Sequence, residues 1–309
     1  MPVLSVSSFS PAHITGFFSS YFDTDDPLKS GSTGAGFSIN RGVRTQVEYL
    51  KTSQRNNEVF INNILSDAKV SLKTLELFKS RYNIGADVFY RISHSIEIPM
   101  GCGFGTSGAG ALSVSMALHQ LHEIDAPLDK IAQIAHLAEV QLKTGLGTVT
   151  AETYGGMEIR LLPGAPGIAE LAFIKYSGYS AAFCVWGPIA TSELLQDKKI
   201  RERINHFGNE MVNQLKNDPC VSRFMKLSYK FTNKLNIFSI NTKKLIEELK
   251  NKNILSAMLM FGDGVFVLYQ PSQLEVVKGI LNKFSDEAEI IYCEIEEKGV
   301  RLIDQNRGT

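Results

Sequence analysis

Cysteine is scarce in this sequence, with four among 309 residues. Cys102, Cys184, Cys220 and Cys293 are widely spaced and form no Cys-x-x-Cys pair, so we expect reduced thiols, with neither zinc nor disulfide bonds. An excess of either charge is also missing, because 32 basic and 32 acidic residues give a formal net charge of zero. Without a basic block that follows a phosphodiester backbone, nucleic acid is not an expected partner.

Long apolar runs are absent as well. No stretch reaches the ~18 consecutive apolar residues of a membrane span, and the N-terminus carries no positive charge before its apolar residues. These absences predict a cytoplasmic protein without a membrane partner. What the sequence does contain is 44% hydrophobic residues, over a length sufficient for one large or two ordinary domains with a buried core.

The succession of patterns predicts an α+β fold with a helix-covered antiparallel sheet in its last third. Pro11 is expected to end the first strand, and the stretch 23–36 is expected to form an acidic, glycine-rich loop. A domain boundary is placed after residue 175, giving domains at 1–175 and 176–309. Strand patterns occur at 3–9, 37–50, 87–98, 157–162, 181–186, 255–261, 265–269 and 289–294. Helix patterns occur at 68–82, 107–122, 128–143, 192–235 with a break at Asp218-Pro219, 243–252 and 273–284.

The segment from Ile98 to Gly110, IPMGCGFGTSGAG, follows a predicted strand and leads into a predicted helix. Glycines at such a junction let backbone N–H groups converge on an anion, and the helix macrodipole adds about half a positive charge there. Thr106 and Ser107 supply hydroxyls for a helix cap, a phosphate or Mg²⁺. The segment therefore predicts a phosphate-binding loop, which we call the glycine loop.

Three other interpretations of the glycine loop compete with this one. A Walker A loop needs Gly-Lys-Ser/Thr, and this chain has Gly105-Thr106-Ser107 without lysine. Gly103, Gly105 and Gly108 do satisfy a dinucleotide G-x-G-x-x-G motif, but a second helix follows Pro127 where a Rossmann unit needs a second strand. A plain glycine-rich turn that caps a tightly packed helix stays open as an alternative.

The glycine loop resembles the phosphate loop of the GHMP kinase superfamily, P-x-G-x-G-L-G-S-S-A-A. The resemblance implies ATP and Mg²⁺ as cofactors. It also implies a two-domain α+β fold, with an N-terminal ribosomal-protein-S5-like domain and a C-terminal ferredoxin-like domain. The residues it assigns to ATP binding are Pro99, Gly101, Gly103, Gly105, Thr106, Ser107, Gly108 and Ala109.

Four further segments are similar to archaeal pantoate kinases within this superfamily: SPAHITGFF, DPLKSGSTGAG, EIRLLPGAPG and GPIATSELL, starting at Ser10, Asp26, Glu158 and Gly187. That resemblance implies transfer of the ATP γ-phosphate to the 4-hydroxyl of pantoate on the route to coenzyme A, by an enzyme expected to be a homodimer. Two alternatives remain: a GHMP kinase for another small hydroxy acid or alcohol, such as homoserine or mevalonate, and a catalytically weak nucleotide-binding regulator.

The superfamily takes one Mg²⁺ ligand from the glycine loop and one from the helical region after it, which points here to Ser107 and Glu139. Glu139 follows His136 by three residues, so both side chains project from one helix face. The alternative is a solvent-exposed His–Glu pair.

A substrate carboxylate calls for a planar, bidentate donor, and Arg160 is the candidate. Alternation along 157–161 leaves Glu158 and Arg160 on the same strand face, so an ordinary cross-strand ion pair is the competing explanation. Ser32, His136 and Thr191 lie in segments resembling the pantoate-binding parts of the family; Thr191 would otherwise cap the helix after it.

Many GHMP kinases use as catalytic base an aspartate seven residues before Gly155-Gly156, where this chain has Thr148. Glu152 is the nearest acid that would substitute for it. His13 occupies the place where many superfamily members have lysine, so it is either a catalytic group that polarises the reacting hydroxyl or a phosphate, or a structural histidine.

The segment Gly262-Asp263-Gly264 has two readings. It lies in a stretch that looks like a degenerate third glycine motif of the superfamily, and Asp-Gly is also a strong signal for a tight hairpin turn.

Overall fold

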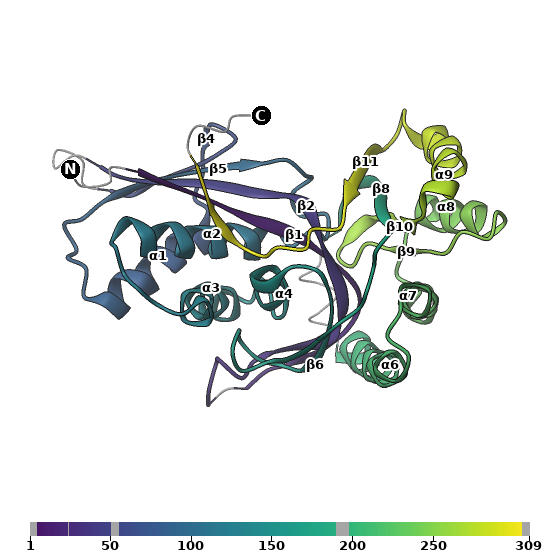
Figure 1. The fold of residues 1–309 in the computed structure, drawn as a ribbon, viewed down its shortest axis with the longest axis horizontal. Coiled ribbons are helices and arrows are strands. Elements are labelled where there is room, and N and C mark those ends of the chain that lie inside the picture. The colour runs from purple at the N-terminus through teal and green to yellow at the C-terminus, as the bar shows by residue number, and fades with distance from the viewer. Residues whose placement is uncertain (1–4, 24, 51–55, 190–197, 305–309) are drawn as a thin grey trace.

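The computed structural model describes residues 5–23, 25–50, 56–189 and 198–304. Two β-sheets form its centre: a larger one with helices below it on the left of Figure 1, and a smaller one on the right. In the described ranges no helix is long and apolar enough to cross a membrane.

The larger sheet has the strand order β12–β1–β2–β5–β3–β4. In addition, β6 pairs with the N-terminal part of β2, and β7 pairs with β6. Its bounds are β1 Ser5–Tyr21, β2 Gly31–Tyr49, β3 Glu58–Ile61, β4 Ile64–Leu65, β5 Tyr90–Ile96, β6 Met157–Leu162, β7 Glu170–Phe173 and β12 Arg301–Ile303. The long antiparallel ribbon of β1 and β2 runs through the whole sheet. One end of β2 pairs with β5 and the other with β6, so the ribbon joins the two parts of the sheet.

The expectation that Pro11 ends the first strand is wrong. β1 continues to Tyr21, with a register shift between Pro11 and Ala12. Such a bulge tolerates a residue that has no N–H to donate. The expected loop at 23–36 is also too long, because β2 already starts at Gly31. Within that stretch a Cβ on Gly36 would lie 2.3 Å from the Ile14 carbonyl oxygen, so the glycine allows close strand contact.

Helices cover one face of the larger sheet, with bounds α1 Lys69–Tyr82, α2 Thr106–Leu121, α3 Leu128–Leu142 and α4 Thr148–Tyr154. The first three confirm the sequence patterns, and α2 is buried around almost its whole circumference by α1, α3, α4 and the β1–β2 ribbon. Small residues such as Ala109 and Gly110 permit this packing. Helix α4 was not expected from the sequence, because seven residues are too few to show helical periodicity.

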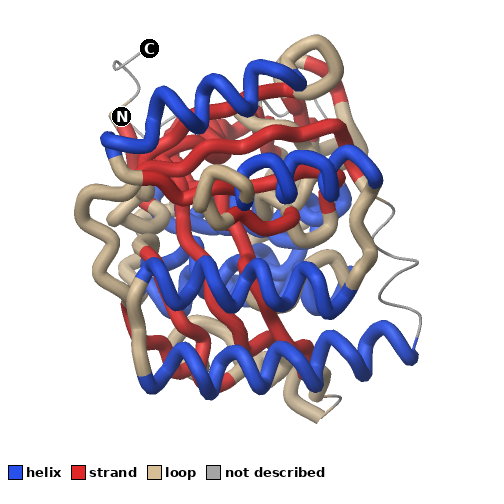
Figure 2. Tube along the Cα trace, turned by 90° about the vertical axis from the view of Figure 1, so that its right-hand side faces the viewer, coloured by secondary structure: helices blue, strands red, loops and turns tan. Residues whose placement is uncertain are grey.

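The smaller sheet has the antiparallel order β11–β8–β10–β9. Helices α8 and α9 cover one face, while α7 and the β1–β2 ribbon cover the other; Figure 2 views this side and shows strands between helices. The bounds are β8 Ser180–Pro188, β9 Ser256–Met258, β10 Gly262–Tyr269 and β11 Glu289–Glu294, with α6 Lys198–Asn217, α7 Val221–Leu235, α8 Ile240–Lys250, α9 Leu274–Leu281 and 3₁₀ turns at Pro271–Gln273 and Asn282–Phe284.

The turn expected at 262–264 lies earlier. Gly262, Asp263 and Gly264 belong to β10 and pair with β8, and the chain reverses just before them, where Phe261 adopts a φ of 72°. The reversal faces the glycine loop, because a Cβ on Gly262 would lie 2.1 Å from the Cys102 carbonyl oxygen. The hairpin-turn reading is therefore wrong in its position.

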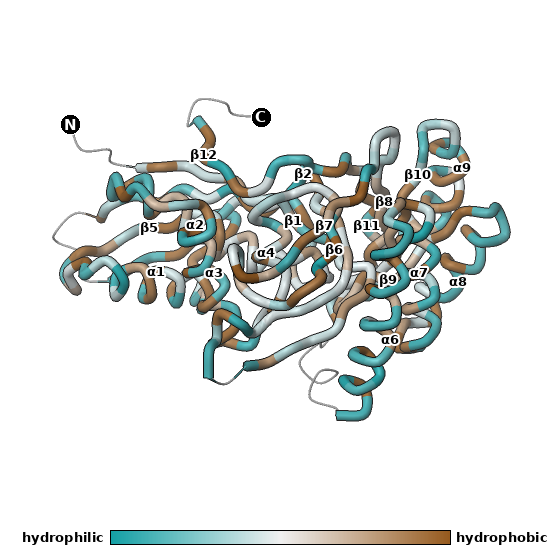
Figure 3. The backbone as a smooth tube through the Cα atoms, turned by 60° about the horizontal axis from the view of Figure 1, so that its bottom comes forward, coloured by the Kyte–Doolittle hydropathy of each residue, from teal (hydrophilic) through white to brown (hydrophobic). Residues whose placement is uncertain are grey.

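Aromatic rings join the two sheets. The ring of Phe224 on α7 lies 6.0 Å from Phe17 and 6.1 Å from Phe37, and Phe37 lies 5.7 Å from Phe266 of the smaller sheet. Each buried ring of this size removes ~150–250 Å² from water. Helix α6 is mostly hydrophilic (teal in Figure 3) and buries one side only, which packs into this core.

Candidate active site

The glycine loop crosses from β5 to the start of α2 in a left-handed backbone path. Gly101, Gly103 and Gly105 have φ values of 73°, 87° and 68°, a region in which other residues are strained. A Cβ on Gly103 would lie 2.4 Å from the Met260 carbonyl oxygen. Phe104 accepts a backbone hydrogen bond of 3.1 Å from His13. The glycines thus fit both a loop packed between β1 and the second sheet and a helix start that exposes N–H groups.

Ser107 and Glu139 meet between α2 and α3. The Ser107 hydroxyl donates to Glu139 Oε1 at 2.5 Å, and the Thr144 hydroxyl donates to the same oxygen at 2.7 Å. Burial raises the pKa of Glu139, and the two hydroxyl donors partly offset this effect. Gly145 makes room for the carboxylate, since a Cβ there would lie 1.9 Å from Oε2.

The alternative of a solvent-exposed His136–Glu139 pair is wrong. The two residues are 1% and 2% exposed. His136 Nε2 lies 3.3 Å from the Pro27 carbonyl oxygen, so this ring nitrogen pairs with the backbone and not with the Glu139 carboxylate. Burial lowers the pKa of His136 to about 4, so the ring is neutral at pH 7. The side chain of His136 holds the turn before β2.

Glu152 lies beside the first turn of α2. A Cβ on Gly105 would lie 2.4 Å from Glu152 Oε1, and one on Gly108 would lie 2.9 Å from Oε2 and 3.0 Å from Thr148 Oγ1. Thr148 and Glu152 are one turn apart on α4, so the hydroxyl and the carboxylate border the same space. Both Glu152 oxygens are buried with no hydrogen-bond partner among the described residues. Burial, followed by the charges of Glu139 and Glu158, raises the pKa of Glu152 well above its usual value.

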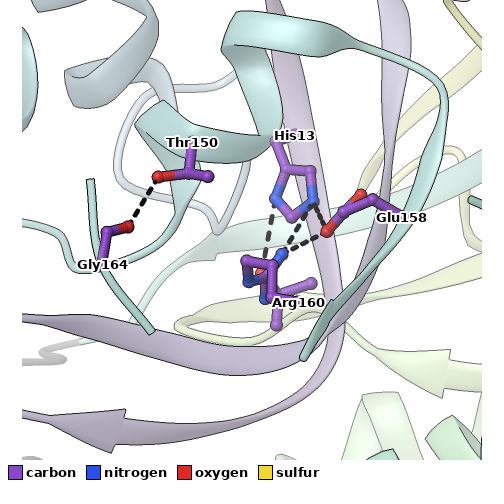
Figure 4. A network of polar contacts seen from close by, with 6 residues as sticks. His13, Thr150, Glu158, Arg160 and Gly164 are labelled. Atoms are coloured by element: carbon purple, nitrogen blue, oxygen red, sulfur yellow. Dashed lines mark hydrogen bonds and ion pairs between the residues drawn. The ribbon is translucent and has the colours of Figure 1, made fainter. Parts of the chain in front are cut away.

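His13, Glu158 and Arg160 form a buried cluster between β1 and β6 (Figure 4). His13 Nε2 lies 2.9 Å from Glu158 Oε1, and Arg160 Nη1 donates to the same oxygen. The pairing is along one strand, from residue 158 to residue 160, and all three side chains are at most 2% exposed. The expectation of a shared strand face is confirmed. Arg160 does form an ion pair with Glu158, as the competing explanation expected, but the pair lies along β6, and the cross-strand partner of Glu158 is His13. Burial lowers the pKa of Arg160, and the Glu158 charge opposes that effect.

Two atoms of this cluster are unsatisfied: Arg160 Nε and Glu158 Oε2 have no hydrogen-bond partner in the part of the chain that the structure describes. Arg160 Nε faces Ser32 across Gly147, because a Cβ on Gly147 would lie 1.9 Å from Ser32 Oγ and 3.1 Å from Arg160 Nε. Three elements therefore converge here: β2, β6 and the start of α4.

The residues 145–148 connect this cluster with the glycine loop. A Cβ on Gly145 would approach both Glu139 and Thr148, at 1.9 and 3.3 Å, while Gly147 lies against Ser32 and Arg160. The structure thus brings Ser32, Glu139 and Arg160 around one segment that ends at Thr148, whereas Thr191 lies outside the described residues. Sequence reasoning missed Gly147 and did not give Glu158 a role of its own. The Gly-Leu-Gly spacing before Thr148 and the alternation along β6 were the available signals.

The donor set fits Mg²⁺. Ser107 and Glu139 offer hard oxygen ligands, and a cation there would offset the cost of burying the Glu139 charge. Within the described ranges, no group of three or more His, Cys, Asp and Glu residues is placed to hold a metal ion.

Comparisons with known proteins agree with the fold. The family model described as the GHMP kinases N terminal domain matches residues 69–156. The pantoate kinase of Thermococcus kodakarensis is 31% identical over 95% of this chain and 98% of its own, and that of Methanocaldococcus jannaschii is 30% identical over 88% and 96%.

A solved structure described as a phosphotransferase related to the CoA biosynthesis pathway superposes with a TM-score of 0.87 at 27% identity, covering 98% of this chain and 99% of that one. The expected GHMP kinase fold is confirmed by these likenesses. The chain therefore belongs to the GHMP kinase superfamily, and it is an ATP-dependent phosphotransferase with an alcohol group as acceptor.

Proposed function

We propose that this enzyme transfers the γ-phosphate of ATP to the 4-hydroxyl of pantoate and thereby produces 4-phosphopantoate for coenzyme A biosynthesis. The observation that carries the proposal is Arg160, which is 2% exposed and whose Nε has no hydrogen-bond partner among the described residues. A buried guanidinium with an unsatisfied donor requires an acceptor. Pantoate brings a carboxylate, and the two relatives above that are 30% and 31% identical are pantoate kinases.

In this proposal Arg160 binds the pantoate carboxylate through the guanidinium edge that carries Nε, because Nη1 already donates to Glu158. Ser32 adds a hydroxyl donor next to that edge. His136 and Thr191 complete the expected set of substrate residues. His136 would act by holding the turn at Pro27, which precedes Ser32 on β2. A planar fork that matches a carboxylate gives more specificity than a single charge.

At the other end, the glycine loop binds the triphosphate along Pro99 to Ala109, with backbone N–H groups between these two residues as donors. Ser107 and Glu139 would hold Mg²⁺, which neutralises phosphate charge when it is bound. Phosphoryl transfer depends mainly on positioning and on charge neutralisation. A closely packed loop at a helix N-terminus, fixed to His13 by a 3.1 Å backbone bond, meets that need.

Glu152 is the proposed proton acceptor for the pantoate hydroxyl, and Thr148 borders the same space. Glu152 lies between the glycine loop and the Arg160 cluster, and burial raises its pKa well above its usual value, which makes the carboxylate a stronger proton acceptor. His13 supports this end of the site from β1. Compared with an aspartate at position 148, Glu152 places the carboxylate one helical turn further along α4 and on the same face of that helix.

The proposal is tested by ADP release with pantoate, homoserine or mevalonate as acceptor. We expect turnover with pantoate at a kcat/KM at least 100-fold above that with the other two. Turnover that prefers homoserine or mevalonate would contradict pantoate as substrate, and ATP binding without ADP release for any of the three would favour the regulator.

Arg160→Lys is the sharpest variant, because it keeps the positive charge and removes Nε and the fork. We expect it to raise KM for pantoate by about 10- to 100-fold, the effect of losing a hydrogen bond to a charged group, with KM for ATP nearly unchanged. Arg91→Ala, in a surface ion pair with Glu48, is the matched control. Equal changes in both KM values would argue against a carboxylate clamp.

A further inference from the structure

Glu158 belongs to the buried cluster but has no role in the proposed chemistry so far. Its Oε1 accepts from both His13 Nε2 and Arg160 Nη1, and its side chain is 1% exposed. A buried guanidinium without a counter-charge is strongly unfavourable. Glu158 is the carboxylate that supplies the counter-charge to Arg160, from two residues away on the same strand.

The position of this bond decides which part of Arg160 is left for a ligand. The guanidinium is planar, so a bond at Nη1 fixes the orientation of the whole group. With Nη1 held, Nε lies on the Ser32 side, 3.1 Å from the place where a Gly147 Cβ would be. Without the bond to Glu158, the guanidinium would be able to rotate, so that Nε leaves that position or its N–H groups donate to other acceptors.

The same oxygen also orients His13. A hydrogen bond from Nε2 to a carboxylate selects the tautomer that carries its proton on Nε2. Nδ1 then faces Thr15 Oγ1 at 3.5 Å. The backbone N–H of His13 donates to Phe104 in the glycine loop, so Glu158 connects the arginine cluster to the strand segment that supports that loop.

We propose that Glu158 is a positioning residue, which through one carboxylate oxygen orients Arg160 for the carboxylate of the acceptor and fixes His13 beneath the glycine loop. This inference rests on the proposed function in so far as the acceptor carries a carboxylate. Glu158 itself does not touch the substrate; it acts through its two neighbours.

The test compares Glu158→Gln with wild type, with Glu48→Gln in the surface pair with Arg91 as isosteric control. We expect Glu158→Gln to raise KM for pantoate by about 10- to 100-fold and KM for ATP by less than about 3-fold, while the control changes neither. A residue that only stabilises the fold would lower the active fraction and leave both KM values unchanged, which would overturn the proposal.

A double-mutant cycle separates an action through Arg160 from an independent one. Added to Arg160→Lys, Glu158→Gln is expected to raise KM for pantoate by less than about 3-fold more, and fully multiplied effects would refute the proposal. If Glu158→Gln does not fold, Glu158→Asp keeps the charge, and it should raise the same KM because its shorter side chain reaches only one partner. An unchanged KM for pantoate in that variant would equally count against positioning.

The acceptor screen with wild type distinguishes the two ideas. If wild type prefers another acceptor that carries a carboxylate, pantoate fails as substrate, and the same KM comparison with that acceptor still tests Glu158. If wild type prefers pantoate and Glu158→Gln leaves its KM unchanged, Glu158 fails while the proposed function stands.

Discussion

Two buried histidine clusters in this molecule differ in how completely their polar atoms are paired. Around His94, both ring nitrogens are bonded, to Thr45 Oγ1 at 2.8 Å and to Ser71 Oγ at 2.9 Å. Thr45 contacts Ser113 at 2.5 Å, and Ser113 also donates to the Gly110 carbonyl at 2.9 Å. Around His13, by contrast, Arg160 Nε and Glu158 Oε2 stay unsatisfied among the described residues.

The difference indicates what each cluster is for. A closed network of neutral groups binds β5, β2, α1 and α2 together and needs nothing further. An open network with charged groups at a loop that exposes N–H donors is costly for the isolated protein. Its cost is explained if substrate supplies the missing acceptor for Arg160 Nε, as expected of a functional site.

The largest effect is expected from removing the Glu152 carboxylate. Glu152→Gln should lower kcat by ~10²–10⁴-fold, the usual contribution of a general base, without lowering the free energy of unfolding, because the amide removes a buried ionisable group. Steady-state kinetics and denaturant unfolding measure the two quantities.

The control for Glu152 is to restore a carboxylate one turn earlier. Thr148→Asp in the Glu152→Gln background should recover most of the lost kcat, since Thr148 Oγ1 and Glu152 Oε2 border the same position near Gly108. Unimpaired turnover in Glu152→Gln alone would refute the assignment.

A smaller effect, on stability, is expected at His94. Burial lowers the pKa of His94 from 6.5 to about 4, so as the pH falls below 6.5 the unfolded chain takes up a proton that the folded chain refuses. The stability contributed by neutral His94 is complete above pH 6.5, and ~3 kcal/mol of it is lost by pH 4. Denaturant unfolding between pH 7 and pH 4 gives the unfolding free energy as a function of pH. Its slope should be shallower for His94→Gln than for wild type, by the equivalent of up to one proton, and identical slopes would contradict the prediction.

The smallest effect is expected from opening the closed network at Thr45. Thr45→Val keeps the shape but leaves His94 Nδ1 and Ser113 with one partner fewer, at a cost of ~1–3 kcal/mol of unfolding free energy. Because the network lies away from the Arg160 cluster, kcat and both KM values of the folded enzyme should stay within about 2-fold of wild type. A marked rise in KM for pantoate would remove the distinction between the two clusters.

Local signals in the sequence predicted much of this molecule. The glycines and hydroxyls of the glycine loop, Pro127 at the start of α3 and the alternation along β6 each act over a few residues, and the structure has the expected elements there. The roles of Ser107, Glu139 and Arg160, the boundary after residue 175 and the homodimer stay predictions.

Features set by distant parts of the chain were missed. The bulge at Pro11 depends on pairing with residues near Gly42. Helix α4 was missed for a different reason, because it is too short to show periodicity. The role of Glu158 depends on His13, 145 residues earlier in the chain. A strand pattern shows which face a side chain occupies, but not which side chain another strand brings to it.

The return of β12 to the edge of β1 bears on how the enzyme is made. Ser7–Phe9 pair with residues 301–303, the Val300 N–H donates to the Glu152 carbonyl at 3.0 Å, and the Gly156 N–H donates to Glu296 at 2.7 Å. During synthesis β1 therefore keeps one edge unpaired, and α4 lacks this support, until residues 296–303 have left the ribosome. Truncation near residue 295 should therefore yield an inactive chain that is prone to aggregate, although every proposed site residue is present.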